Sequence, residues 1–178
     1  MATKLTELEG CVLGLVWEMG TCTTYAIRKV FQRSPNPYWS GSAGAIYPLV
    51  RRLESSGLLR AREDYTGQRR RDLYEVTARG LRELRSWVGP RVLDWSVSIP
   101  VDLLRTRIRF LGVLKSPERA EFLANAEQQL LRQIREAEKE CRSLEATKEP
   151  YPYLVARGVA KIARARLSWI REATALLC

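Results

Sequence analysis

The sequence predicts a mainly α-helical protein with a small two-stranded β wing. A winged helix-turn-helix is expected first, followed by C-terminal helices that pair in an antiparallel, coiled-coil-like way. Three observations predict this fold: apolar residues recur at helical spacing along most of the 178 residues, two strand-like segments flank a glycine turn, and two long amphipathic stretches occupy the last third of the chain. We place the domain boundary near residue 89, which gives domains 1–89 and 90–178.

Two helices are expected in the first 34 residues. Thr6 and Glu9 have the spacing of a capping box, in which each side chain accepts from the other's backbone amide, and Gly20 supplies the end of this helix. Thr23 is placed to cap the second helix, and Ser34 precedes the proline that stops it.

The third helix opens between Ser40 and Ser42 and closes at Gly57. Pro48 lies inside it and removes a hydrogen bond to the carbonyl of Gly44. We therefore expect an irregular first turn.

A two-stranded hairpin follows the third helix. Residues 58–65 and 69–76 read as strands on either side of Thr66-Gly67-Gln68. Thr77 then caps a further helix that Gly89 and Pro90 end.

The second domain begins with a connector over residues 90–100 and a helix over residues 101–114. Ser116-Pro117-Glu118 is a start signal for a long helix, with Ser116 as its cap, and Pro150-Tyr151-Pro152 separates it from the final helix. The predicted seams of the two helices are Leu123, Ala126, Leu130, Ile134, Ala137, Cys141 and Leu144, and Val155, Val159, Ile162, Trp169, Ala173 and Leu176. These seams exceed what one helix pair needs, so the surplus is expected to pack against a second subunit. The alternative is that the two helices pair only with each other, as a hairpin within one chain.

Composition excludes several classes of function. The 30 Lys and Arg outnumber the 20 Asp and Glu, and the formal charge of +10 favours an acidic partner, with nucleic acid before membrane or protein. The chain has no histidine, and its four cysteines form no C-x-x-C pair, so histidine triads and histidine-bearing zinc sites are excluded. We expect no enzymatic activity, no metal and no cofactor. No apolar stretch reaches the roughly 18 residues of a membrane span, and we expect a cytoplasmic protein.

A winged helix-turn-helix places the N-terminal end of its third helix in the major groove, and that end must therefore be small. Residues 40–45 supply small side chains, and basic residues flank them on the second and third helices and around the hairpin. The candidate DNA-binding residues are Tyr25, Arg28, Ser42, Ala43, Gly44, Ala45, Tyr47, Arg51, Arg69, Arg70 and Arg71. Taken singly, each arginine of the strands is as often a solvated residue that protects a strand edge as it is a phosphate contact. Each tyrosine is more often a packing residue than a DNA contact.

Two segments carry a specific pattern of residues. The third helix carries Trp39-x-x-Ser42-x-Gly44-x-Ile46-Tyr47-Pro48-Leu49-x-x-x-Leu53-Glu54-x-x-Gly57-Leu58, and the second strand carries Leu73-Tyr74-Glu75-Val76-Thr77-x-x-Gly80. With these patterns the sequence resembles the PadR family of bacterial transcriptional regulators. The resemblance implies that Ser42, Gly44 and Tyr47 meet DNA and that Tyr25 approaches a phosphate. Ala45 departs from the polar residue common there, and Arg70 replaces the usual proline of the wing.

The resemblance further implies a homodimeric repressor that binds a palindromic operator and is released by a small hydrophobic or phenolic effector. Such a protein is associated with the nucleoid while it is bound to DNA. The competing hypothesis is a basic helical protein-interaction module without sequence-specific DNA binding, which would show no preference for its own promoter.

An effector pocket is expected where the two domains join, because pockets favour such junctions and aromatic walls suit flat phenolic ligands. The candidate residues are Trp95, Tyr151, Tyr153 and Trp169. The alternative is that these aromatic side chains fill the core of the junction.

Overall fold

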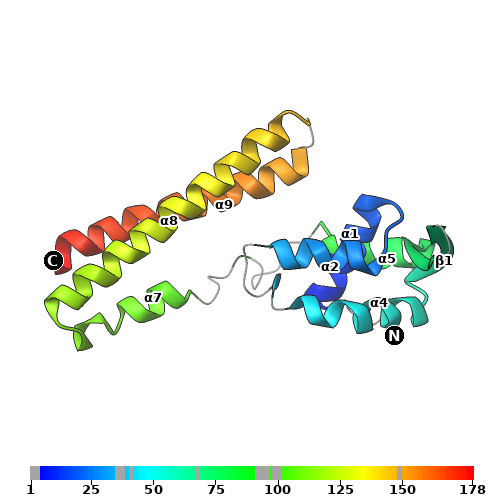
Figure 1. Cartoon of the computed structure of the whole chain (residues 1–178), viewed down its shortest axis with the longest axis horizontal. Helices are drawn as coiled ribbons and strands as arrows, with labels where there is room; N and C mark the ends of the chain where they lie inside the picture. Colours follow the sequence, from blue (N-terminus) through cyan, green and yellow to red (C-terminus); the bar gives the residue numbers. More distant parts are fainter. Residues whose placement is uncertain are drawn as a thin grey trace. The chain divides into compact units, whose positions relative to one another are not determined.

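The computed structural model describes residues 5–34, 39–40, 42–66, 69–90, 97, 102–147 and 150–178. The chain divides into an N-terminal unit, Met1–Val97, and a C-terminal unit, Ser98–Cys178 (Figure 1). The expected boundary near residue 89 follows the last residue of the N-terminal unit's final helix. Most of the connector, residues 91–96 and 98–101, lies outside the described residues.

The N-terminal unit is a winged helix-turn-helix, as predicted. Its elements are α1 (Glu7–Met19), α2 (Thr24–Arg33), the 3-10 turn η1 (Ser42–Ala45), α4 (Ile46–Ser55), β1 (Leu59–Thr66), β2 (Arg69–Val76) and α5 (Ala78–Val88). All three predicted threonine caps are confirmed: the hydroxyls of Thr6, Thr23 and Thr77 accept from backbone amides at 3.3, 3.2 and 2.9 Å.

The third helix, which we call the recognition helix, begins irregularly, as Pro48 predicts. Residues Ser42–Ala45 form a 3-10 turn, and the regular helix α4 begins at Ile46, two residues before Pro48. Gly57 ends the helix in the left-handed region at φ 69°, where a side chain would be strained. A 3-10 turn has fewer residues per turn than an α-helix and is therefore narrower, so the end of the helix that carries the small residues is slim.

The core of the N-terminal unit lies where α1, α2, α4 and the base of the hairpin meet. Its most buried side chains include Leu13, Ile27, Ile46, Leu49 and Leu59. Along α1, Leu13 is buried, whereas Met19 at the end of the helix is exposed. The helix packs against both α4 and α5.

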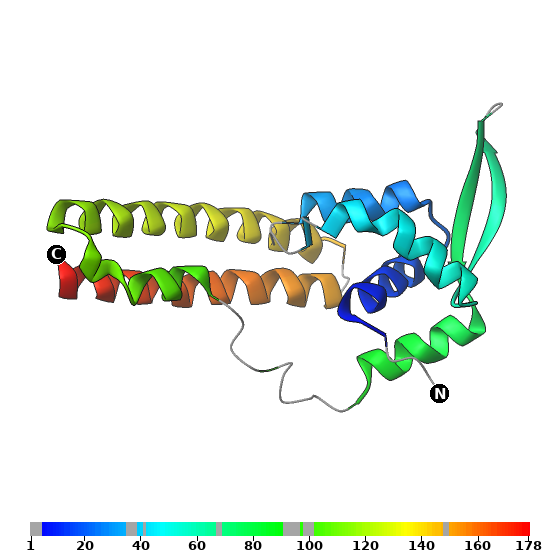
Figure 2. The same ribbon diagram turned by 90° about the horizontal axis from the view of Figure 1, so that it is seen from below.

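The wing is an antiparallel pair that projects from the helices as a long ribbon (Figure 2). Its register places Asp64 opposite Arg71 and Arg62 opposite Leu73. An isolated bridge between Cys22 and Tyr74 ties β2 to the turn before α2, with backbone hydrogen bonds of 3.1 and 2.8 Å.

The C-terminal unit is a long antiparallel helical hairpin with a short helix beside it. It contains α7 (Leu103–Ile108), the 3-10 turn η2 (Leu111–Val113), α8 (Ser116–Glu145) and α9 (Pro150–Leu177). The helix expected over residues 101–114 is wrong in its extent, because it ends at Ile108. None of the helices in the described ranges is both long and apolar enough to cross a lipid bilayer.

Two details of the long helices differ from the prediction. Lys115, not Ser116, is the cap of α8: the Glu118 carboxylate accepts from the Lys115 backbone amide at 2.8 Å, so Ser116 is the first helical residue. On α9, three residues of the predicted seam do not pack against α8 within the single chain. Val155, Ile162 and Leu176 are 70%, 65% and 83% exposed.

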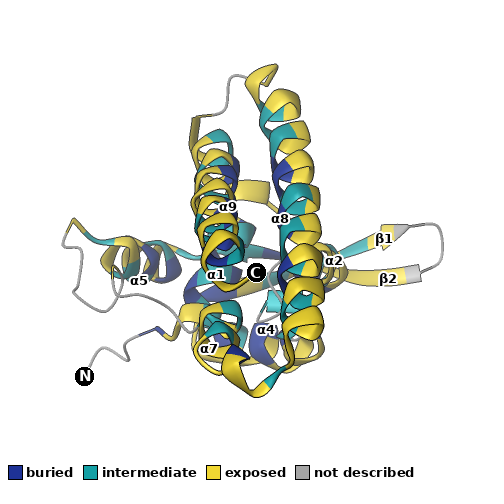
Figure 3. Cartoon of the chain, turned by 90° about the vertical axis from the view of Figure 1, so that its left-hand side faces the viewer, coloured by how far each residue is buried: buried dark blue, intermediate teal, exposed yellow. Residues whose placement is uncertain are grey.

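A stripe of small residues on α9 faces α8 instead. The buried residues of α9 are Ala156, Ala160, Ala163, Leu167, Ile170 and Ala173. Alanine side chains let two helix backbones approach closely, which explains why this stripe, and not the bulkier one beside it, is enclosed. Figure 3 shows the buried residues on the facing sides of α8 and α9 and the exposed residues on their outer sides.

Candidate nucleic-acid interface

The small end of the recognition helix presents an open surface. Gly44 and Ala45 are exposed, and a Cβ built on Gly44 would have no neighbouring atom within 4 Å. Ala43 is only 5% exposed and packs in the core, so it anchors this end. Ser42 is half-buried and Tyr47 is 44% exposed. The edge of a DNA groove could therefore approach Gly44 closely, with the exposed Tyr47 side chain beside it.

A shallow pocket of about 450 Å³ lies beside this end, between the start of α2, α4 and β2; we call it the α2–α4–β2 pocket. It is lined by Thr23, Thr24, Tyr25, Tyr47, Arg51, Arg71, Asp72 and Tyr74. Four of these residues, Tyr25, Tyr47, Arg51 and Arg71, were predicted from separate segments of the sequence. The fold brings three phenols, two guanidinium groups and one carboxylate to this surface. The excess of hydrogen-bond donors and positive charge suits a phosphate of a nucleic-acid backbone.

The floor of the pocket contains two polar residues that were not singled out from the sequence. Thr24 and Tyr74 are 8% and 7% exposed, and their side chains are hydrogen-bonded to each other. Burial raises the pKa of the Tyr74 hydroxyl, so this group stays protonated at neutral pH. Tyr74 belongs to the strand pattern quoted above, and that pattern was the only sequence signal for it.

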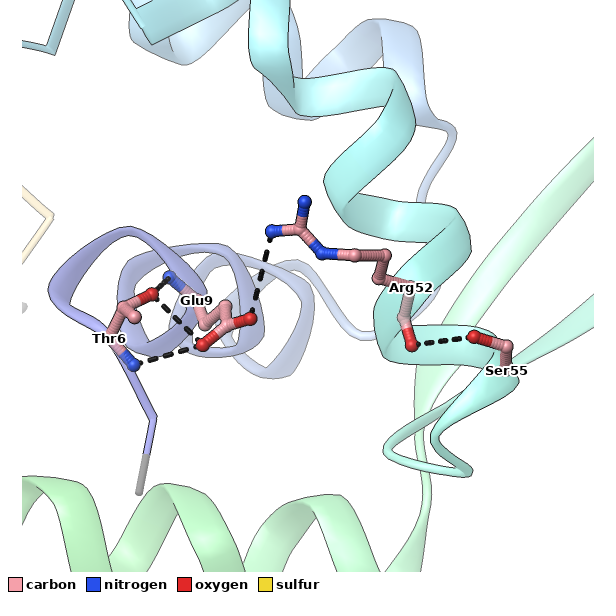
Figure 4. A network of polar contacts seen from close by, with 4 residues as sticks. All are labelled: Thr6, Glu9, Arg52 and Ser55. Carbon is pink, nitrogen blue, oxygen red and sulfur yellow. Dashed lines mark hydrogen bonds and ion pairs between the residues drawn. The ribbon is translucent and has the colours of Figure 1, made fainter. Parts of the chain in front are cut away.

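The two neighbouring arginines of α4, Arg51 and Arg52, lie in different surroundings. Arg51 lines the pocket and has no ion pair within the part of the chain that the structure describes. The guanidinium of Arg52 instead lies 3.7 Å from the Glu9 carboxylate on α1 (Figure 4). Glu9 also accepts from the backbone and hydroxyl of Thr6, both at 2.9 Å. The cap of α1 is thereby linked to the recognition helix.

The arginines of the wing are largely paired with acids of the wing. Arg71 donates to Asp64 at 2.6 Å, and Arg70 lies 2.9 Å from Glu63 and 3.7 Å from Asp72. Arg71 holds the pKa of Asp64 below its ordinary value, chiefly through that hydrogen bond.

The remaining basic residues near the wing and on α2 differ in whether they are paired with a carboxylate. Arg60 pairs with Glu75 at 2.7 Å. Arg28 and Arg62 form no ion pair within 4.0 Å among the described residues, although the charge of Arg62 also helps to lower the pKa of Asp64. The side chain of Arg69 lies outside the described part of the structure.

Of the residues proposed for an effector pocket, the three that the structure describes are not all brought together in one chain. Trp95 lies outside the described residues. Tyr151 and Tyr153 are in the first turn of α9, with Tyr151 exposed and Tyr153 beside Arg157, whose guanidinium carbon is 5.9 Å from the phenol ring centre. Trp169 is on the same helix, about 24 Å further along at 1.5 Å per residue, and packs against the core of the hairpin.

Comparison with known proteins finds related sequences for both parts of the chain. Residues 12–86 match the transcriptional regulator PadR-like family, and residues 102–177 match the C-terminal family of virulence activator alpha. A curated relative, the negative transcriptional regulator PadR of Bacillus subtilis, is 22% identical over 180 residues, which cover 96% of this chain and 97% of the relative.

Two solved structures share the fold. Bacillus subtilis PadR in complex with operator DNA superposes with a TM-score of 0.84 at 20% identity and covers 97% of this chain and 100% of that chain. Bacillus subtilis PadR in complex with p-coumaric acid superposes with a TM-score of 0.75 at 20% identity, covering 96% of this chain and 94% of that chain.

Proposed function

This chain belongs to the PadR-like family of transcriptional regulators, and from that membership we propose that it is a homodimeric repressor of a palindromic operator that a small phenolic effector releases. The α2–α4–β2 pocket carries this proposal, because it joins the recognition helix, the preceding helix and the wing in one basic, tyrosine-lined surface. The solved relative bound to operator DNA supports it as a likeness of fold. A regulator that works on DNA acts in the cytoplasm, at the nucleoid.

We assign the DNA contacts by exposure and chemistry. Gly44, Ala45 and Tyr47 face the major groove, with the methyl group of Ala45 suited to a thymine methyl. Ser42 can donate a hydrogen bond at the same end. Ala43 contributes by anchoring the turn in the core.

The phosphate contacts come from residues around the recognition helix. Tyr25 and Arg51 receive a backbone phosphate in the pocket, and Arg28 lies on the same helix as Tyr25. Arg69, Arg70 and Arg71 follow the next stretch of backbone from the wing.

A second copy of the chain covers the exposed stripe of α9. Val155 and Ile162 are seven residues apart and therefore lie on one face of the helix, away from the alanine stripe that meets α8. Burying such a stripe against its symmetry mate is the usual way in which a two-fold dimer of helical hairpins forms. The dimer then presents two recognition helices to two half-sites.

The effector proposal is narrower than the set of aromatic residues first considered. Tyr153 and Arg157 are adjacent, and an arginine beside a phenol ring suits a ligand that carries a carboxylate and an aromatic ring. The p-coumaric acid complex of the Bacillus subtilis relative makes phenolic acids the first compounds to test. Trp169 is too far along α9 to contribute to the same site in the same chain.

A footprint on the DNA upstream of the protein's own gene tests the proposal. We expect protection of two half-sites whose centres are about one helical turn, or 10 base pairs, apart, and loss of that protection when a phenolic acid is added. A basic protein-interaction module would leave no defined footprint. Protection that no phenolic acid removes would exclude the effector and retain the DNA-binding function.

A further inference from the structure

The wing carries almost as many acids as arginines. Strands β1 and β2 together contain five arginines and four acids, so the ribbon that should face phosphates has a formal charge of only +1. The register of the hairpin places two of the acids directly opposite arginines: Asp64 faces Arg71, and Glu75 faces Arg60. Glu63 and Asp72 face each other, and Arg70 lies 2.9 Å from the first carboxylate and 3.7 Å from the second.

An arginine that already holds a carboxylate gains less from a phosphate than a free arginine does. The phosphate must displace the carboxylate, and the displaced carboxylate then stays near the phosphate and repels it. The side chains of Arg71 and Asp64 are 49% and 32% exposed, so their pair is weak enough for a phosphate to compete with it. The effect is therefore a graded loss of affinity and not a block.

Asp64 is the acid for which this matters most. Its partner Arg71 is the wing arginine that lines the α2–α4–β2 pocket, beside Tyr25, Tyr47 and Arg51. Arg51 forms no ion pair among the described residues, although Asp72 also lines the pocket, whereas Arg71 is directly paired with Asp64. Arg71 is therefore the cation of the pocket whose charge is offset by an ion pair.

We infer that Asp64 is an internal counterion of the DNA-binding surface: it holds Arg71 in the free protein and lowers the affinity for every DNA sequence alike. The inference rests on the proposed DNA-binding function. Asp64 stays ionised at neutral pH because its pKa is lowered, so the attenuation is constant over the physiological range. It restrains the sequence-independent part of binding and leaves base reading to the recognition helix.

The test is the Asp64→Asn variant of the full chain, which removes the charge and keeps the shape. We expect binding to the protein's upstream DNA and to random DNA to tighten by the same factor, about three- to tenfold. The log–log salt slope should steepen by up to about 0.9, because Arg71 then neutralises its phosphate without an internal counterion. Glu83→Gln is the matched control, because it makes the same change in net charge on α5, outside the pocket and the wing.

A double-mutant cycle with Arg71→Ala locates the effect. Asp64→Asn in the Arg71→Ala background should change affinity no more than Glu83→Gln does, because Asp64 acts through Arg71. If Asp64→Asn equals Glu83→Gln in the otherwise unchanged chain, or tightens binding equally without Arg71, the inference is overturned. Failure of the unchanged chain to prefer its upstream DNA would instead overturn the proposed function, a result that the wild-type titration reports separately.

Discussion

Gly10 on α1 lies directly against the indole ring of Trp87 on α5, so closely that a Cβ at position 10 would come within 2.2 Å of Trp87 Cε2. The indole Nε1 also donates to the Glu7 carboxylate at 3.3 Å. Because α5 ends at Val88, this contact fixes the last helix of the N-terminal unit to the first one. The absence of a side chain at Gly10 is what lets the two helices meet.

Gly10→Ala should therefore destabilise the N-terminal unit by about 1–3 kcal/mol, the usual cost of overpacking a filled core. Gly14→Ala, one turn further along α1, is the control, because its Cβ would meet Leu84 Cδ1 at an ordinary 4.0 Å and should be neutral or stabilising by up to about 1 kcal/mol. Urea denaturation of both variants measures the difference. Equal stabilities would show that Trp87 does not occupy the space above Gly10.

Gly44→Leu should leave folding unchanged and reduce operator affinity by about tenfold or more, since the added side chain would point into open space in the free protein and into the groove in the complex. Thermal denaturation and an operator titration give the two numbers. A variant that folds normally and binds as tightly as the unchanged protein would place the recognition surface elsewhere.

The adjacent arginines of α4 should differ in their contribution to DNA binding. Arg51→Ala removes a cation from the pocket and should weaken binding to all sequences while lowering the log–log salt slope by about 0.9. Arg52→Ala removes the partner of Glu9 and should leave the slope unchanged. Salt titrations by fluorescence anisotropy compare the two directly. Identical slopes for both variants would contradict the orientation of the two side chains.

Ile162→Asp should dissociate the dimer without unfolding the hairpin, because Ile162 is exposed in the single chain and its charge is costly only in the subunit interface. Operator affinity should fall with it, since one half-site is then bound alone. Ser168→Asp adds the same charge at another exposed position of α9 and is the control. Sedimentation that finds the Ile162 variant still dimeric would remove this stripe from the interface.

The thiols of Cys11 and Cys178 should differ in reactivity. Burial, and secondarily the charge of Glu7, raises the pKa of Cys11 to about 11, so this thiol is protonated and slow to react at pH 8, whereas Cys178 is exposed. Because the thiol of the unfolded chain ionises near pH 9, the contribution of Cys11 to stability is complete below pH 9 and declines as the pH rises toward 11. Labelling with a chromogenic disulfide measures the rates. Loss of the fast phase in Cys178→Ser confirms the assignment, and rapid labelling of Cys11 in the folded protein would refute it.

The sequence predicts the N-terminal unit well because its signals are local. The caps at Thr6, Thr23 and Thr77 each involve a hydroxyl and an amide three residues apart, and the hairpin is set by one short turn. The pocket was predictable only in part. Its tyrosines and arginines could be named, whereas the burial of Tyr74 depends on the bridge to Cys22, which joins segments 52 residues apart.

The C-terminal unit was harder to predict because α9 has two apolar stripes. Judged by hydrophobicity, the stripe that contains Val155 and Ile162 would be expected to pack against α8. In the structure the alanine stripe beside it is buried instead, because small side chains let the two helices approach closely. The spacing of apolar residues in a sequence shows that a segment is helical. It does not show which of two adjacent apolar stripes will pack against the neighbouring helix α8.

The most direct test of the account is a titration of the full chain with the DNA upstream of its own gene and with a scrambled duplex of the same length, at about 0.15 M salt. The account predicts that the upstream DNA binds about a thousandfold or more tightly than the scrambled duplex, which is typical of specific regulators. Equal affinity for the two duplexes would contradict it and favour a basic surface that recognises charge alone.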